Sequence, residues 1–186
     1  MPFAELAAEA FASKFNRQGK LSPGELGALL RELGILPRRR ASGWFLATVD
    51  EQPAGILGLD WRGRKSDIGM RSLLKTVGRF GLTHPLRIAL MGLALSHECI
   101  VGECYVDQVA TAAAFRRQGV GTALMEQARI FAAEKGFEVL TLSVAANNPA
   151  VRLYERLGFS CTRRRSSGFM KALFGQKEWL YMTLPL

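Results

Sequence analysis

The amino-acid sequence predicts an α/β fold in which a mixed central β-sheet is flanked by helices. A strand pattern over residues 100–111 is followed by a helical pattern over 120–134 and a second strand pattern over 139–145. Strands joined by a crossover helix usually pair in parallel. Earlier in the chain, two apolar or β-branched runs at 44–49 and 55–61 flank "DEQPA", whose length and turn residues predict an antiparallel hairpin.

Helical spacing marks most of the remaining chain. Apolar residues recur every three to four positions over 3–16, 24–33, 66–97 and 149–157. Ser22 followed by Pro23 and Glu25 is typical of a helix start. We therefore expect two opening helices, a helical insertion around 66–97 that holds two more, and a short late helix. A last strand is predicted near 178–184.

Length and composition predict one globular domain over residues 1–186. The chain is 48% hydrophobic and 9% aromatic. That content excludes a largely disordered chain, which lacks the apolar surface needed to offset conformational entropy.

The charge balance permits an anionic partner. Lys and Arg outnumber Asp and Glu by 25 to 16, a formal net charge of +9. Nucleic acid, an acidic membrane surface and a polyphosphate cofactor all fit this balance. The arginine runs at 37–40 and 163–165 are typical of solvated surfaces, and no recognition helix or aromatic-interleaved groove stands out, which disfavours nucleic acid.

Cysteine usage and the terminal segment favour a cytoplasmic protein. Cys99, Cys104 and Cys161 form no CxxC pair, which indicates neither a disulfide framework nor a zinc site, so no metal is expected. The N-terminal segment lacks the early basic cluster of a secretory signal. The most apolar run, 88–96, is shorter than the ~20 residues of a spanning helix, so no transmembrane segment is expected.

The stretch "FRRQGVG" at 115–121 places two glycines where a strand gives way to a helix. Helix N-termini carry free N–H groups and a partial positive charge, and glycine lets the backbone approach another group closely. Arg116 and Arg117 add full positive charges, so the turn is suited to binding a pyrophosphate. The dinucleotide fingerprint GxGxxG and the Walker pattern both fail here.

The same stretch resembles the GNAT superfamily of acyl-CoA-dependent N-acetyltransferases. Residues 116–121, "RRQGVG", match its central motif Q/R-x-x-G-x-G/A, and "NNPAVRLYERLGF" at 147–159 matches a second motif in the right order. The resemblance is firm over about 105–159, which would be the cofactor-binding core. It implies a GNAT-like fold with acetyl-CoA as the acyl-donor cosubstrate.

The resemblance also implies which residues hold the cofactor. The pyrophosphate falls on the glycine turn and its arginines: Arg116, Arg117, Gln118, Gly119, Val120, Gly121 and Thr122. Pantetheine falls on the backbone of Val109, Ala110 and Thr111. An asparagine before the last helix contacts the cofactor, and both Asn147 and Asn148 are candidates.

Catalytic roles follow in the same way. Tyr154 corresponds to the tyrosine that protonates the leaving thiolate, although a half-buried aromatic on an amphipathic helix is the alternative. Glu103, Tyr105 and Asp107 alternate along one face of the 100–111 strand. Glu103 and Asp107 are therefore candidates for the base that deprotonates the amine, at even odds with a structural or substrate-binding role.

The predicted function is transfer of an acetyl group to a primary amine of a small molecule or peptide. The acceptor is expected between the 66–97 helices and the chain after Phe159, among Met70, Leu73, Phe169, Leu173 and Phe174. Alternatives are a transferase for another acyl-CoA, a non-catalytic CoA-binding module, and a basic module for nucleic acid or lipid. A homodimer is compatible with the sequence.

Overall fold

The structure is a computed structural model of the chain and describes residues 6, 22–32, 42–63, 76, 97–168, 171 and 175–186. Apart from Leu6, Thr76 and His97, the predicted helix over 3–16 and the insertion around 66–97 lie outside these residues. The arginine run at 37–40 and the expected acceptor residues Met70, Leu73, Phe169, Leu173 and Phe174 also lie outside them.

The described strands form one mixed sheet of six strands, in the order β1-β2-β3-β4-β6-β5. Their bounds are β1 Trp44–Val49, β2 Gln52–Trp61, β3 Glu103–Thr111, β4 Val139–Ala145, β5 Ser160–Ser166 and β6 Glu178–Pro185. β3 and β4 pair in parallel, and every other neighbouring pair is antiparallel. The predicted α/β fold with a mixed sheet is confirmed.

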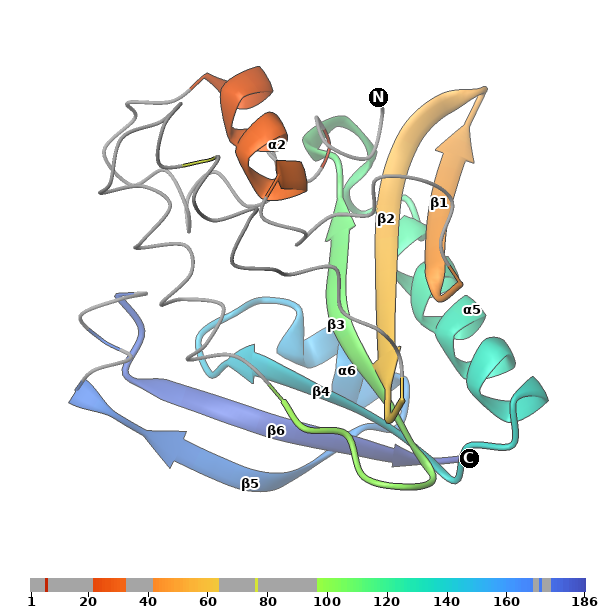
Figure 1. Cartoon of the computed structure of the whole chain (residues 1–186), viewed down its shortest axis with the longest axis vertical. Coiled ribbons are helices and arrows are strands. Elements are labelled where there is room, and N and C mark those ends of the chain that lie inside the picture. Colours follow the sequence, from red (N-terminus) through yellow and green to blue (C-terminus); the bar gives the residue numbers. More distant parts are fainter. Residues whose placement is uncertain are drawn as a thin grey trace.

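Within the described residues, three helices and one 3-10 turn accompany the sheet: α2 Pro23–Glu32, η1 Ala113–Phe115, α5 Val120–Glu134 and α6 Val151–Arg156. Figure 1 shows α5 crossing the sheet beside β1 and β2, with α6 behind β4. No helix in the described ranges is long and apolar enough to cross a membrane.

The start of α2 confirms the predicted cap. The Glu25 N–H donates to Ser22 Oγ at 3.3 Å, and the Ser22 N–H donates to Glu25 Oε2 at 2.8 Å. This reciprocal pair satisfies backbone donors that the first helical turn leaves open, and such a cap typically contributes about 1 kcal/mol.

The first hairpin is tighter than predicted. Asp50 and Glu51 both have positive φ, at 47° and 62°, and Val49 pairs directly with Gln52. These angles are those of a two-residue type I′ turn, whose twist matches that of the strands it joins. β2 therefore begins at Gln52 rather than at the predicted Gly55.

Two further predictions are corrected. The strand expected from Ile100 begins at Glu103, because residues 101–102 form a turn in which Gly102 has a φ of 80°. β5, at the edge of the sheet, was not predicted at all. Each of its residues is exposed, so it carries no alternation of apolar and polar side chains.

The described core lies between α5 and one face of the sheet. Val120, Leu124, Met125, Ala128 and Ala132 on one side of α5 pack with alternate residues of the central strands. Those residues include Cys104 and Val106 of β3, Leu140 and Leu142 of β4, and Leu180 and Met182 of β6. Because side chains alternate between faces, the residues between them, Glu103, Tyr105, Thr141 and Tyr181, lie on the opposite face.

Candidate active site

β3 and β4 separate halfway along their length. Their parallel pairing runs from Glu103 opposite Val139 to Val106 opposite Leu142 and extends no further. Beyond that point β3 continues along β2, whereas β4 continues along β6. Figure 1 shows the two strands diverging. The splay leaves one backbone edge of each strand without a strand partner.

The backbone of Val109 and Thr111 faces this splay. The Ala112 N–H donates to the Ala54 carbonyl on β2, and the same register pairs Ala110 with Ile56. Since N–H and C=O groups of alternate residues point to opposite sides of a strand, those of Val109 and Thr111 point away from β2. The polar backbone groups of Ala110 point toward β2.

The glycine turn lies at the end of β3 and begins α5. Gly119 is the N-cap with a φ of 83°, and Arg117 also has a positive φ, 61°. The first helical bond joins the Ala123 N–H to the Gly119 carbonyl at 2.9 Å. Within the described ranges, the N–H groups of residues 117 to 122 donate to no acceptor. Free donors of this kind and the helix dipole both favour an anion over a cation at this position.

Gly121 brings the turn close to its neighbours. A Cβ added there would lie 3.3 Å from Leu153 Cδ2 and 3.7 Å from Thr111 Oγ1. Leu153 belongs to α6 and Thr111 ends β3, so Gly121 lies where the splay, the turn and α6 meet. The side chains of Arg116, Arg117 and Gln118 are exposed around it. Arg116 Nε approaches the Thr111 carbonyl at 3.5 Å, and Gln118 Nε2 donates to the Ala114 carbonyl at 2.9 Å.

Tyr154 lies on the face of the sheet that α5 covers. Its side chain is 6% exposed, belongs to the buried core and packs on the Phe159 ring, with 6.0 Å between centroids. Burial raises the pKa of Tyr154 to about 12, so the phenol keeps its proton at neutral pH. A group in that state can act as a proton donor.

The two asparagines differ in their contacts. Asn148 Oδ1 accepts the Ala150 N–H at 2.9 Å, a local bond that shapes the chain just before α6. Asn147 is exposed, and its side chain makes no hydrogen bond within the described part of the chain.

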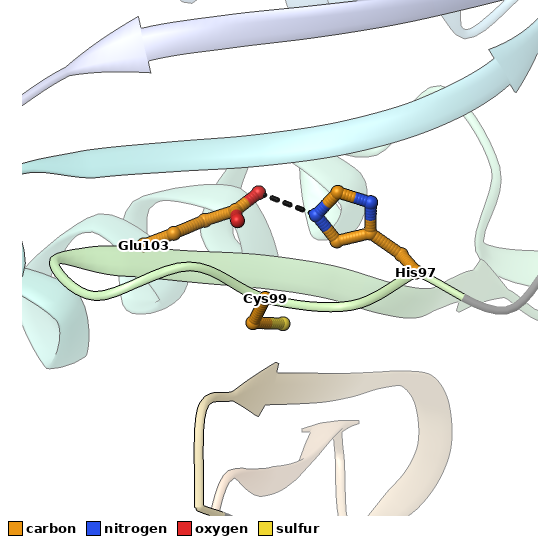
Figure 2. A group of neighbouring side chains, drawn as sticks. All are labelled: His97, Cys99 and Glu103. Atoms are coloured by element: carbon orange, nitrogen blue, oxygen red, sulfur yellow. Dashed lines mark hydrogen bonds and ion pairs between the residues drawn. The ribbon is translucent and has the colours of Figure 1, made fainter.

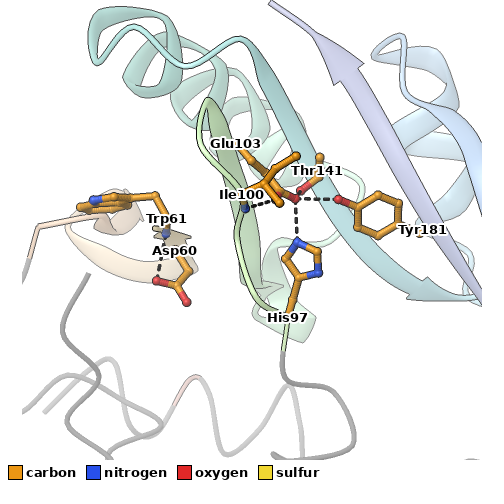
Figure 3. Close-up of polar contacts among 7 residues, drawn as sticks. All are labelled: Asp60, Trp61, His97, Ile100, Glu103, Thr141 and Tyr181. Atoms are coloured by element: carbon orange, nitrogen blue, oxygen red, sulfur yellow. Dashed lines mark hydrogen bonds and ion pairs between the residues drawn. The ribbon is translucent and has the colours of Figure 1, made fainter. Parts of the chain in front are cut away.

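The opposite face of the sheet holds a buried carboxylate, Glu103. Its Oε1 accepts the hydroxyls of Thr141 at 2.5 Å and Tyr181 at 2.6 Å and lies 2.7 Å from His97 Nε2, while Oε2 accepts the Ile100 N–H at 2.9 Å. Figure 3 shows these contacts converging on one carboxylate. Burial alone raises the pKa of Glu103, but the hydrogen bonds outweigh it and hold that pKa below its usual value.

Asp107 lies on the same strand, one residue beyond the last β3–β4 pair, and is exposed. The structure thus brings the two predicted base candidates onto one strand but in different surroundings. Glu103 is enclosed by donors, whereas Asp107 lies where the strands separate.

His97, Cys99 and Glu103 together place ligand-type atoms within 4.8 Å of one another. Burial, followed by the nearby carboxylates Asp60 and Glu103, raises the pKa of the Cys99 thiol to about 12. A metal binds the thiolate rather than the thiol, so this shift opposes metal binding. In Figure 2 the Cys99 side chain is turned away from the contact between Glu103 and His97. The absence of a resident metal stays a prediction.

Comparison with protein-family models decides the family. The model described as "Acetyltransferase (GNAT) family" matches residues 14–159. The chain belongs to this family. The family and the class of enzyme predicted from "RRQGVG" and "NNPAVRLYERLGF" are thereby confirmed.

Relatives within the GNAT family carry two kinds of name. The chain is 32% identical over 81 residues to a streptothricin acetyltransferase of Streptomyces lavendulae, a match that covers 43% of each protein. It is 30% identical over 109 residues to the [ribosomal protein bS18]-alanine N-acetyltransferase of Escherichia coli, which covers 58% of this chain and 70% of the relative. The chain therefore spans less than half of the first relative and about two thirds of the second.

Solved GNAT structures share the fold. The structure of a GCN5-related N-acetyltransferase from Kribbella flavida covers all of this chain with a TM-score of 0.61 at 19% identity, and 90% of that chain is covered. A structure described as a streptothricin acetyltransferase from Bacillus anthracis, in complex with acetyl coenzyme A, covers 77% of this chain. Its TM-score is 0.51 at 18% identity, and 62% of that chain is covered.

Sequence reasoning missed one member of this site. The sequence pattern places residue 97 only at the end of the predicted helical insertion, yet His97 contacts Glu103 directly. The signal available was weak, a histidine six positions before a strand acid.

Proposed function

We propose that this GNAT protein transfers the acetyl group of acetyl-CoA to a primary amine on a small molecule or peptide. The observation that carries the proposal is the row of free N–H groups at 117 to 122, placed at the mouth of the splay between β3 and β4. A helix N-terminus of this kind suits a pyrophosphate. A related fold has been solved with acetyl coenzyme A, which supports the same donor here.

The donor would lie along the splay. With the pyrophosphate on the 117–122 turn, the pantetheine chain would reach the free edge of β3. Val109 and Thr111 offer their N–H and C=O groups on that edge. Ala110, also predicted as a contact, directs its backbone to β2, so we assign the pantetheine bonds to its two neighbours.

Asn147 is the better candidate for the asparagine contact. The Asn148 amide is engaged with Ala150 at 2.9 Å, whereas Asn147 is exposed beside the start of α6. We therefore assign the cofactor contact to Asn147 and a structural role to Asn148.

Acetyl transfer would proceed by direct attack. The neutral amine attacks the thioester carbonyl and forms a tetrahedral intermediate, which collapses with cleavage of the C–S bond. Tyr154, protonated at neutral pH, would donate its proton to the departing thiolate. The products are the acetylated amine and CoA, and the proton lost by the amine passes to a base.

Relatives support an amine acceptor without choosing one. One is named for the alanine of a ribosomal protein and another for streptothricin. A donor with a longer acyl chain remains the alternative. A single domain over 1–186, a cytoplasmic location, a homodimer and the absence of a metal also remain predictions from the sequence.

Heat stability measured with different ligands tests the donor. A ligand that binds only the native state raises the melting temperature. Acetyl-CoA should raise it, whereas NAD at the same concentration should not. A larger rise in melting temperature with longer acyl-CoAs would indicate that the donor carries another acyl group. No shift with any of these CoA compounds would contradict the proposed cofactor site.

Turnover is then measured as release of the CoA thiol. The acceptors tested are amino acids, aryl amines and short peptides that begin with alanine. Thiol release that depends on one of these amines is the expected result. A chain that binds acetyl-CoA but acetylates none of them, nor a wider set of amines, would be a CoA-binding module.

A further inference from the structure

The imidazole of His97 is held by a buried carboxylate. Glu103 is 2% exposed and lies 2.7 Å from His97 Nε2. Glu103 also accepts Thr141, Tyr181 and the Ile100 N–H, and its pKa is lowered, so the group is ionised and only accepts hydrogen bonds. The proton of the neutral imidazole must therefore be on Nε2, which leaves the lone pair on Nδ1.

The position of the ring is fixed on a second side. His97 stacks on Tyr105, with 4.4 Å between ring centroids and 23° between planes, and its side chain remains 24% exposed. Its Nδ1 has no partner within the described ranges. A locked, partly exposed imidazole with a free lone pair is the arrangement that a carboxylate produces when it orients a histidine base.

The ring lies next to the splay. Tyr105, on which it stacks, pairs with Thr141, and the next pair, Val106 with Leu142, is the last before β3 and β4 separate. His97 and Glu103 lie on the face of the sheet opposite the core that contains Tyr154. A thioester in the splay would thus meet the phenol from one face and the imidazole from the other.

We propose that His97 is the general base of the acetyl transfer and that Glu103 is the residue that positions it. This inference rests on the proposed function. It replaces Glu103 as a candidate base, because all four of its contacts are with groups of the protein and its carboxylate is buried. It leaves Asp107, which is exposed where the strands separate, outside the proposed pair.

The proton and electron balance is complete. His97 Nδ1 takes a proton from the acceptor nitrogen as the N–C bond forms, and becomes an imidazolium that Glu103 stabilises. The C–S bond breaks, and the thiolate takes the Tyr154 proton. The imidazolium then releases its proton to solvent, and the Tyr154 phenolate takes a proton from solvent, which restores the starting state.

Other charged and titratable groups surround the imidazole. They are Tyr105 and Asp107 on β3, Tyr181 on β6, the Cys99 thiol on the segment before β3, and Asp60 on β2, which acts on Cys99. Arg163 of β5 lies over the Tyr181 ring at 5.9 Å. Their common effect on the pH profile is removed by comparing variants of the same chain.

The test compares His97→Gln and Glu103→Gln with Cys99→Ser. Glutamine at 97 can still donate to Glu103 but has no basic nitrogen. Glutamine at 103 can donate to Nε2 and so move the imidazole proton to Nδ1, where it blocks the lone pair. Serine at 99 removes a thiol near the same contact and leaves both members of the pair intact.

With an amine that the parent accepts, His97→Gln and Glu103→Gln should each lower kcat/KM by about 10²- to 10⁴-fold. Stabilisation by acetyl-CoA and its KM should be unchanged. The profile of kcat/KM against pH should differ between the parent and His97→Gln. Cys99→Ser should match the parent, with or without a chelator.

Nuclear magnetic resonance tests the positioning without turnover. The chain has two histidines, so loss of one set of imidazole signals in His97→Gln assigns the other to His84. Long-range ¹H–¹⁵N spectra of the parent should show His97 protonated on Nε2. The spectrum of Glu103→Gln should show the proton moved to Nδ1.

Each contrary outcome is distinct. If the parent acetylates the amine and His97→Gln keeps the parent's rate and pH profile, His97 is not the general base. A parent His97 protonated on Nδ1 would overturn the positioning. Loss of activity in Cys99→Ser or on chelation would replace the pair with a metal centre. A parent that acetylates no amine would overturn the proposed function, and the base with it.

Discussion

At the scale of single residues, Tyr154 is a buried phenol that keeps its proton at neutral pH. Its pKa is raised to about 12 by burial, and its ring is held against Phe159. A phenol there can protonate a thiolate but contributes little to cofactor binding. Removing only the hydroxyl therefore separates chemistry from packing.

The variant Tyr154→Phe should lower kcat by roughly 10- to 10⁴-fold and leave stabilisation by acetyl-CoA unchanged. Single-turnover rates and melting temperatures measure the two effects. If the variant acetylates at the parent rate, Tyr154 only packs the core and water protonates the thiolate.

The asparagine pair provides a matched comparison. Asn147→Ala should weaken stabilisation by acetyl-CoA with little change in the melting temperature of the free chain, because its side chain is exposed and makes no hydrogen bond among the described residues. Asn148→Ala should lower the melting temperature, because it removes the bond to the Ala150 N–H, and such local bonds are worth about 1 kcal/mol. Scanning calorimetry with and without acetyl-CoA measures both. The reverse pattern would exchange the two roles.

The local sequence predicts which residues share a face of β3 but not what surrounds them. Glu103 was predicted to share a face with Tyr105 and Asp107, yet two of its partners, Thr141 and Tyr181, lie 38 and 78 positions away. Only tertiary pairing of β3, β4 and β6 brings them together. Burial of an acid and its role as a positioning residue follow from that pairing, which no local spacing reports.

At the scale of elements, the glycine turn depends on a left-handed backbone at the start of α5. Gly119 has a φ of 83°, and nothing lies within 4 Å of an added Cβ. Gly136, just beyond the other end of α5, has a φ of 72° and equally open surroundings. A residue with a Cβ would therefore meet the same backbone strain at either position, at opposite ends of one helix.

Valine at either position should cost roughly 1–2 kcal/mol of stability through that strain. Only Gly119→Val should also abolish stabilisation by acetyl-CoA, because its side chain would crowd the N–H groups of the turn. Melting curves with and without the cofactor compare the two variants. Equal stabilisation of both by acetyl-CoA would place the pyrophosphate elsewhere.

Element bounds were predictable where one face is buried. The bounds of α5 and β4 agree with the prediction, since each carries a regular apolar face. β5 reads "SCTRRRS" and is exposed throughout, so hydrophobic periodicity has nothing to detect there. The first hairpin turn was set by positive φ at Asp50 and Glu51, residues that tolerate this conformation less readily than glycine does.

At the scale of the whole molecule, the net charge of +9 bears on the acceptor. Arg163, Arg164 and Arg165 are exposed on β5, and Arg163 lies over the Tyr181 ring beside the Glu103 contact. Cations on this side of the sheet repel an acceptor of high positive charge. An amine with an apolar or anionic part is better suited to this surface.

Spermine and spermidine should therefore have a kcat/KM well below that of a monoamine or an alanine peptide, and added salt should narrow the difference. Initial rates at low and high ionic strength measure this. A clear preference for either polyamine at low salt would contradict the role given to the arginines.

The fold class was accessible from sequence because the patterns that predict it are local. The cofactor contacts stay predictions, and the residues expected at the acceptor side lie outside those that the structure describes.

Amide hydrogen exchange with and without acetyl-CoA measures the cofactor site directly. Acetyl-CoA should slow exchange at residues 117 to 122, whose N–H groups are otherwise free, and at Val109 and Thr111 on the open edge of β3. Exchange at Ala110, whose backbone faces β2, should change much less. Slowed exchange confined to other segments, with no change at 117 to 122, would contradict the placement of the cofactor on this turn.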